Sequence, residues 1–334
     1  MQLRKVDTIA LIAVLLTAMI LLGELGAYVF KPNDYSASAS WNGGDLEYTV
    51  YSNGSDGYDV VSMLDTDPVS ELYIYLDEDF ERNIGAAGTI ARVMGFDQRA
   101  VADQLEKQLS FRGVTQITEV DSSGLRDFIL STESDPAGKA LFVAGYSLPA
   151  SIYKGDPSDP LINWISNGGR LYWTASEIGR MYNDGDGVHE VSGNQMLFLG
   201  AAACIFTDSA RATEVDGSGY CRMFALRNNE MSFAASTSIP NGLSMGYVYG
   251  GYASVSLVGK GSGEVCLFSG DLSMDHIGDM AQVIASAVSS GTFVVGTASG
   301  ELKGGVSGSI AGPSDSVYIY IGGINTVFGR CFHA

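Results

Sequence analysis

Two hydrophobic periodicities alternate through the middle of the chain. Residues 141–144 form a continuous apolar run, which is typical of a strand buried on both faces. Residues 161–165 carry an apolar stripe that begins after Asp159 and Pro160, a good N-cap and a good first helical residue. The glycine pair 168–169 predicts the helix end, and a second apolar strand begins at once over 170–174. The stretch 139–182 therefore predicts a strand, a helix, a second strand and an exposed turn.

The same alternation extends in both directions from this stretch. Further strands are expected at 71–77, 115–120 and 264–270, and further helices at 97–111, 121–130 and 276–288. Strands that alternate with helices of about ten residues or more predict right-handed βαβ units. We therefore expect an α/β fold with a mainly parallel sheet flanked by helices, over residues 70–290.

The segments on either side of this α/β region carry the residue pattern of β-strands. Residues 46–51 and 58–64 predict a β-hairpin within 45–66, and residues 291–334 contain strand-like segments without a helical pattern. We expect these two segments to form a small β-rich subdomain. A further hairpin is expected between a strand at 246–257 and the strand at 264–270.

The N-terminus predicts a membrane anchor. Residues 6–30 are apolar enough to cross a bilayer, and Arg4 and Lys5 precede them, which places the tip 1–5 in the cytoplasm. A cleaved signal peptide with a small-residue site at 36–38 is the alternative. Residues 31–44 are rich in Ser, Asn, Asp and Gly and predict a tether. The sequence thus predicts a single-pass protein of the cell membrane, with most of the chain outside the cytoplasm.

Charge restricts the partners. The chain has 38 acidic and 19 basic residues and a formal net charge of −19. No Lys/Arg cluster is present to neutralise a row of phosphates, so we expect no nucleic-acid partner. The expected partners are the lipid bilayer, through residues 6–30, and a protein or an envelope polymer. No cofactor is expected.

Cysteines and a sequon add modification candidates. Cys204 and Cys221 flank one short connection and form the candidate disulfide, whereas Cys266 lies in a core strand and is expected to be a buried thiol. Asn53 begins the sequon Asn53-Gly54-Ser55 and is the glycosylation candidate.

Ligands of open α/β sheets bind at the carboxyl ends of the parallel strands. The loop 146–154 and the turn 175–182 follow two predicted strands, and their polar and aromatic residues are the candidate ligand-binding residues: Tyr146, Ser147, Tyr153, Ser176, Glu177, Arg180 and Tyr182. Three carboxylates follow this turn and could bind Ca²⁺ through their oxygen atoms: those of Asp184, Asp186 and Glu190. They lack the full register of a calcium loop, which favours a solvated turn.

The order of elements resembles a known family. It is similar to the order found in class I glutamine amidotransferase-like domains. The segments that carry this resemblance are Val143-Ala144-Gly145-Tyr146, the helix ending in Asn167-Gly168-Gly169, the strand 170–174 and the late strand 261–268. Active members of that family carry a G-x-C-x-G nucleophile after the second of these strands. In this chain the turn reads Thr174-Ala175-Ser176-Glu177-Ile178-Gly179, with serine in place of the cysteine. The resemblance therefore implies the scaffold without the amidotransferase activity.

Two functions follow from these observations. The first is a binding or scaffold protein of the cell envelope, built on a catalytically inactive amidotransferase-like domain. The second is an extracytoplasmic serine hydrolase, in which His276 would act as the base for Ser176. Hydrogen-bond distance between these two side chains would favour the hydrolase.

Overall fold

The computed structural model describes about three fifths of the chain. The described residues are 35–42, 44–53, 57–77, 98–143, 147–174, 177–202, 204–205, 234–236, 239–249, 252–268, seven helical residues between 277 and 288, 292–301, 317–321, 324–328 and 332–333. Within these residues, no helix has the length and the apolar character that a bilayer span requires. The predicted anchor at 6–30 lies outside the described residues.

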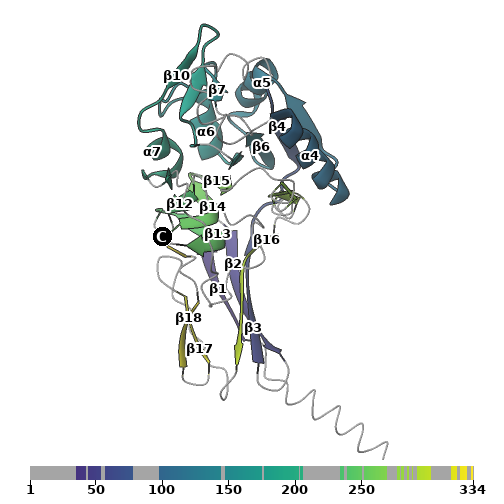
Figure 1. Ribbon diagram of the computed structural model, residues 1–334, viewed down its shortest axis with the longest axis vertical. Helices are drawn as coiled ribbons and strands as arrows, with labels where there is room; N and C mark the ends of the chain where they lie inside the picture. Colours follow the sequence, from purple (N-terminus) through teal and green to yellow (C-terminus); the bar gives the residue numbers. More distant parts are fainter. Residues whose placement is uncertain are drawn as a thin grey trace, which may run out of the picture.

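A ten-stranded sheet forms the centre of the α/β part, which we call the head (Figure 1). Its order is β11-β12-β14-β15-β8-β6-β4-β5, with β13 paired to β14 and β19 paired to β13. The strands are β4 (Glu71–Tyr75), β5 (Ile117–Val120), β6 (Lys139–Val143), β8 (Arg170–Thr174), β11 (Cys204–Ile205), β12 (Ala234–Ser236), β13 (Gly242–Tyr249), β14 (Tyr252–Lys260), β15 (Gly263–Phe268) and β19 (Phe332–His333). The run β5-β4-β6-β8-β15 is parallel and forms the core of the sheet. The predicted α/β class with a mainly parallel sheet is confirmed.

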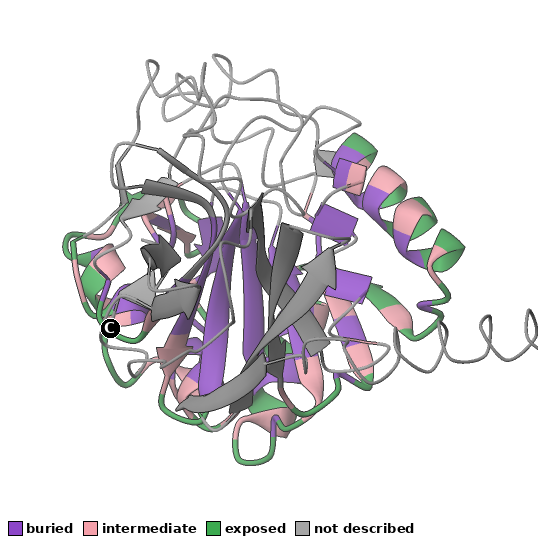
Figure 2. Cartoon of the chain, turned by 90° about the horizontal axis from the view of Figure 1, so that it is seen from below, coloured by how far each residue is buried: buried purple, intermediate pink, exposed green. Residues whose placement is uncertain are grey.

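Helices cover the sheet from both sides, and its central strands are buried (Figure 2). α5 (Ser122–Thr132), α6 (Pro160–Ser166) and α7 (Asn194–Leu199) pack in one core cluster with alternate strand residues such as Leu171 and Trp173. Tyr172 and Cys266 are buried outside this cluster and therefore lie on the opposite face. α4 (Gln98–Phe111) lies beside the helical residues of 277–288. A hydrogen bond joins the two: Arg112, the residue after α4, donates to the Gly278 carbonyl at 3.1 Å.

A second sheet, which we call the stem, lies beneath the head in Figure 1. It is antiparallel, in the order β1 (Tyr35–Trp41), β2 (Gly44–Asn53), β3 (Gly57–Asp65) and β16 (Thr292–Glu301). The pairing of β3 with β16 joins the early hairpin to the C-terminal segment. β17 (Val317–Ile321) and β18 (Ile324–Phe328) form a separate hairpin.

Two sequence predictions are wrong at this level. Residues 35–41, expected in the tether, form strand β1, which pairs antiparallel with β2 along its whole length. The expected strand at 246–257 is divided between β13 and β14, which pair antiparallel from Tyr249 and Tyr252 onward. In both segments small residues made the pattern ambiguous.

Candidate functional site

The two loops expected to bind a ligand come together at the carboxyl edge of the head sheet. β7 (Ser147–Pro149) pairs parallel with β9 (Met181–Asn183), which pairs antiparallel with β10 (Val188–Glu190). The hydroxyl of Tyr153 donates to the Gly179 carbonyl at 2.7 Å and ties one loop to the other. Tyr153 is fully buried, so its ring belongs to the core rather than to an exposed binding surface.

Asp159 holds the first of these loops in place. Its Oδ2 accepts hydrogen bonds from the backbone amides of Lys154, Gly155 and Asp156, at 2.7, 2.9 and 2.8 Å. Successive amides that converge in this way form a nest for an anion, which here is the chain's own carboxylate. Asp159 occupies the predicted N-cap position of α6, but its side chain makes no capping bond there. The predicted side-chain cap is therefore wrong, since the carboxylate stabilises the preceding loop instead.

Glu177 and Arg180 are engaged within the second loop. One carboxylate oxygen of Glu177 accepts from the side-chain amides of Gln195 at 2.8 Å and Asn194 at 3.2 Å. The other oxygen lies 3.2 Å from Arg180 Nη1, and Arg180 Nη2 lies 3.7 Å from Glu190. These contacts attach the loop to α7. Both side chains therefore have a structural role at the edge of the sheet.

Strands β9 and β10 and the turn between them carry a small polar cluster. Tyr182 stacks on His189 with ring centroids 4.8 Å apart, and His189 Nε2 lies 2.7 Å from Asp184 Oδ2. Asp184 also accepts from the amides of Asp186 and Gly187, and these backbone hydrogen bonds lower the pKa of its carboxyl group. In the described part of the chain, no three His, Cys, Asp or Glu side chains converge on a point where a metal ion could bind.

Other predicted residues fall in two groups. Tyr146, Ser176, Cys221 and His276 lie outside the described residues, as do the side chains of Asn53 and Cys204. Ser147 and Cys266 are described and buried, and Ser147 Oγ has no hydrogen-bond partner within the described part of the chain. Cys266 is a free thiol, as predicted, and burial raises its pKa, which makes it a poor nucleophile.

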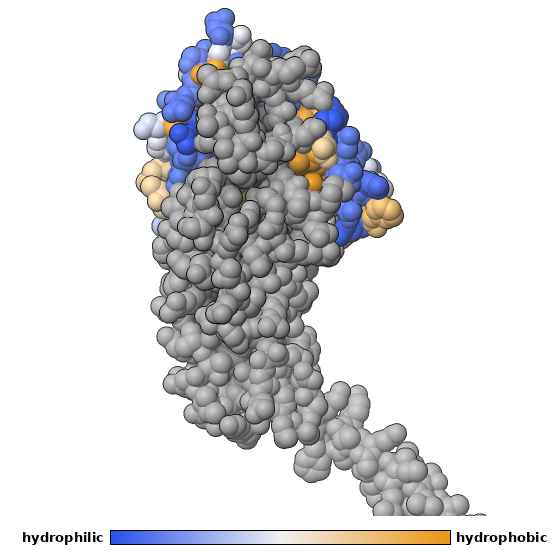
Figure 3. All heavy atoms as spheres, in the orientation of Figure 1, coloured by the Kyte–Doolittle hydropathy of each residue, from blue (hydrophilic) through white to orange (hydrophobic). Residues whose placement is uncertain are grey.

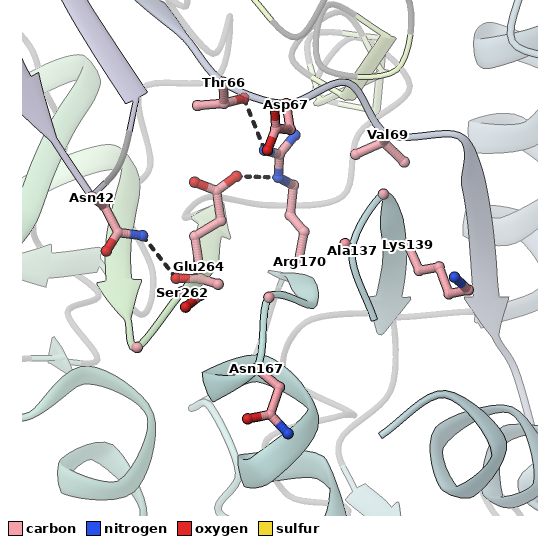
Figure 4. A pocket seen from close by; sticks show the side chains of 14 residues that line it. Asn42, Thr66, Asp67, Val69, Ala137, Lys139, Asn167, Arg170, Ser262 and Glu264 are labelled. Carbon is pink, nitrogen blue, oxygen red and sulfur yellow. Dashed lines mark hydrogen bonds and ion pairs between the residues drawn. The ribbon is translucent and has the colours of Figure 1, made fainter. Parts of the chain in front are cut away.

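A cavity of about 450 Å³ lies at the opposite, amino edge of the same strands (Figure 4). It is lined by 14 residues from the stem, the segment after β3 and the starts of β6, β8 and β15. Arg170, Glu264, Thr66 and Asp67 group together on one side, whereas Lys139 and Asn167 point away from that group. The cavity therefore lies at the junction of stem and head.

A buried ion pair forms the floor of this cavity. Glu264 is the register partner of Arg170 on the neighbouring parallel strand, and its Oε1 pairs with Arg170 Nε. The side chains of Arg170 and Glu264 are only 9% and 6% exposed, and Arg170 Nη2 donates to Thr66 at 2.9 Å. Burial raises the pKa of Glu264, while Arg170 opposes that shift. Apart from Arg170, no described residue donates a hydrogen bond to the Glu264 carboxylate.

Asn42 makes a second contact between stem and head. It occupies the turn between β1 and β2 with a left-handed φ of 45°, which Asn tolerates better than most residues. Its side-chain amide donates to the Gly263 carbonyl at 2.9 Å. A Cβ on Gly259 would lie 2.7 Å from the same side chain, so glycine leaves the room in which Asn42 packs.

Comparisons with known proteins leave the family open. No family model matches the chain, and no curated protein matches it in sequence. Among solved structures, the chain is similar to exo-beta-1,4-mannosidase Op5Man5 from Opitutaceae bacterium strain TAV5, with 13% identity and a TM-score of 0.35. The similarity covers 66% of this chain and 34% of that one, so the chain spans about a third of that protein's length. A similarity of this size carries no argument about function.

Sequence reasoning missed the cavity because it assigned no role to the amino edge of the sheet. One signal was present: Arg170 and Glu264 each begin a strand that is otherwise apolar. Charged residues are almost never fully buried unless they are paired. Two opposite charges at equivalent positions of two core strands could therefore have been read as a buried pair.

Proposed function

We propose that the protein is a single-pass, extracytoplasmic binding or scaffold protein of the cell envelope. Residues 6–30 would be its membrane anchor, with the tip 1–5 in the cytoplasm. The head would be an amidotransferase-like domain without the nucleophile of that family. Its partner would be a protein or a polymer of the envelope, and the proposal requires no cofactor.

The direction of the stem strands carries this proposal. β1 runs from Tyr35 to Trp41, and the following turn places Asn42 against Gly263 of the head. β1 therefore runs toward the head, and Tyr35 is at its opposite end. The stem extends beneath the head in Figure 1. β2 has 10 residues, a length of about 33 Å. An anchor that ends at residue 30 would join the remote end of the stem and hold the head away from the bilayer.

The contacts at the carboxyl edge favour binding over catalysis. Glu177, Arg180 and Tyr153 are engaged in contacts that hold the two loops together. On the face that Figure 3 shows, the coloured residues of the head are mostly hydrophilic, with some hydrophobic ones among them. The exposed large apolar residues of the described head, Phe111, Leu130 and Met196, lie on or at the end of three different helices. This surface suits a solvated head that recognises polar ligands.

Membrane fractionation tests the anchor. The full-length chain is compared with a chain that begins at residue 31, and both membrane fractions are washed with high salt and alkaline carbonate. The full-length protein should remain in the membrane after both washes, whereas the shortened protein should be released. Release of the full-length chain, or retention of the shortened chain, would contradict the proposal.

A fluorophosphonate probe tests the loss of catalytic function. The purified protein should not be labelled by the probe at Ser176. Ser176→Ala is the matched control, because it removes the hydroxyl and leaves the turn otherwise unchanged. Labelling of the unaltered protein that disappears in Ser176→Ala would favour the hydrolase instead.

A further inference from the structure

We propose that the cavity between stem and head binds an uncharged saccharide, of the size of a mono- or disaccharide unit. This inference deepens the binding role proposed above and rests on it. The cavity volume of about 450 Å³ lies within the range of about 300 to 1,000 Å³ that is usual for small-molecule sites. Such sites occur preferentially where two parts of a protein meet, as the stem and the head do here.

The charges of the lining exclude an ion as the preferred ligand. Glu264 and Arg170 neutralise each other as an ion pair. Of the other charged residues in the described lining, Asp67 is exposed to water and Lys139 points away from the pair. An anion would meet the two carboxylates, and a cation would meet the guanidinium of Arg170. A neutral ligand avoids both repulsions.

The remaining lining favours a ligand with many hydrogen-bonding groups. None of the 14 lining residues is aromatic, and only Val69 and Ala137 contribute apolar side chains beyond glycine. A flat apolar ring or a nucleobase would therefore find no aromatic stacking surface among the described lining residues. The exposed hydroxyl of Ser262, together with backbone groups of the glycine turns, offers both donors and acceptors. Sugar hydroxyls also donate and accept, so they match this mixture.

Glu264 is the most specific of these groups. Its side chain is 6% exposed, and it faces the cavity from the start of β15 (Figure 4). An ionised carboxylate has about four acceptor positions, and among described residues Arg170 alone engages this one. A hydroxyl of the ligand would donate to the carboxylate without adding charge beside Arg170. We therefore assign Glu264 as the principal contact to the saccharide and Asp67 as a second acceptor.

Ligand-observed NMR and calorimetry on the full-length protein in detergent test this assignment. The probes are glucose, galactose, N-acetylglucosamine, cellobiose and maltose, with inorganic phosphate and spermidine as charged comparisons. The variants are Glu264→Gln and Asp67→Asn, and Asp186→Asn on the opposite edge of the head is the matched control. Glu264→Gln is used if circular dichroism shows that it is folded. Asp67 is exposed, so Asp67→Asn supplies the test independently of folding.

At least one saccharide should bind, and each folded cavity variant should weaken that binding by about tenfold or more, since a hydrogen bond to a charged group is lost. Asp186→Asn should leave the affinity for the saccharide unchanged. Three results would overturn the site: no saccharide bound at about 50 mM, a charged probe bound more tightly than every saccharide, or equal weakening by Asp186→Asn. If no saccharide binds but the full-length protein remains in washed membranes, only the saccharide site is disproved. Release of the full-length protein from the membrane would disprove the proposed function itself.

Discussion

Arg170 and Glu264 are paired across two neighbouring parallel strands, and both side chains are more than nine-tenths buried. Removing two charges from water costs several kcal/mol per ion, and their mutual attraction recovers this only with good geometry and further hydrogen bonds. Thr66 supplies one such bond to Arg170 from the segment that leaves the stem. The pair therefore links the core of the head to the stem, at the floor of the cavity.

Breaking this pair should destabilise the fold strongly. Glu264→Leu or Arg170→Leu alone should lower the free energy of unfolding by about 3 to 5 kcal/mol, because each leaves an uncompensated buried charge. The double variant should lose much less than the sum of the two, since no charge is left buried. Urea denaturation of the four proteins measures this cycle. Additive losses would show that the two residues act independently.

Gly179 should tolerate no side chain. Its φ is +63°, and a Cβ there would overlap the Phe198 ring and approach the Tyr153 hydroxyl. Gly179→Ala should therefore lower the free energy of unfolding by about 3 kcal/mol, from backbone strain and overpacking together. Gly185→Ala is the matched control, because Gly185 has a φ of +95° but open space around it. It should lose about 1 kcal/mol. Equal losses would contradict the packing argument.

Periodicity predicted the head well, because its elements are long and strongly patterned. The helix expected at 121–130 is α5, which begins after Asp121 and buries Leu125, Phe128 and Ile129. The side chain of Asp121 accepts from the Gly124 amide at 2.8 Å. The stem was harder to predict. In β1 the alternating residues are Ser and Ala, which differ too little in hydrophobicity to reveal a strand, and the pairing with β2 determines the outcome.

The candidate site was predicted only in part, for a physical reason. The convergence of loops 146–154 and 175–182 follows from the parallel sheet, in which the carboxyl ends of neighbouring strands share an edge. The roles of single side chains depend on partners distant in sequence. Tyr153 is buried in the core, where its hydroxyl donates to the Gly179 carbonyl, and Glu177 is engaged by α7 residues. The cavity likewise needs residues from Asn42 to Glu264, which only the folded chain brings together.

Asp159 should contribute more to stability than an ordinary acidic residue of the surface. Its carboxylate accepts three backbone amides, so Asp159→Ala should lower the free energy of unfolding by about 2 kcal/mol. Hydrogen exchange should also accelerate at Lys154, Gly155 and Asp156, the three amides released. Asp135→Ala, at an exposed position, is the control and should change neither quantity. Unchanged exchange in Asp159→Ala would disprove the role of the nest.

Buried tyrosines should make the fold sensitive to alkali. Burial raises the pKa of Tyr75, Tyr153 and Tyr172 above the ordinary value of 10.0. Above that pH the unfolded chain releases these protons while the folded chain keeps them, so the unfolded state binds fewer protons and stability falls as pH rises. Each tyrosine should contribute a loss of about 1.4 kcal/mol per pH unit above about pH 10.

Tyr172→Phe checks this alkaline dependence. Urea denaturation at several alkaline pH values measures the free energy of unfolding that is lost per pH unit. Removing one hydroxyl should reduce this loss by the amount that one tyrosine contributes. In the unaltered protein, the tyrosinate absorbance of these residues should appear together with the loss of the far-ultraviolet dichroism. Tyrosinate absorbance of all tyrosines before any loss of structure would contradict the prediction.

Cysteine labelling in intact cells tests the orientation of the protein most directly. Asp186→Cys places a thiol at an exposed position on the head, and Gln2→Cys places one in the N-terminal tip. A membrane-impermeant maleimide should label Asp186→Cys in intact cells, above the level of the unaltered protein, and should label Gln2→Cys only after permeabilisation. Labelling of Asp186→Cys only after permeabilisation, or of Gln2→Cys in intact cells, would contradict a head held outside the cytoplasm by an N-terminal anchor.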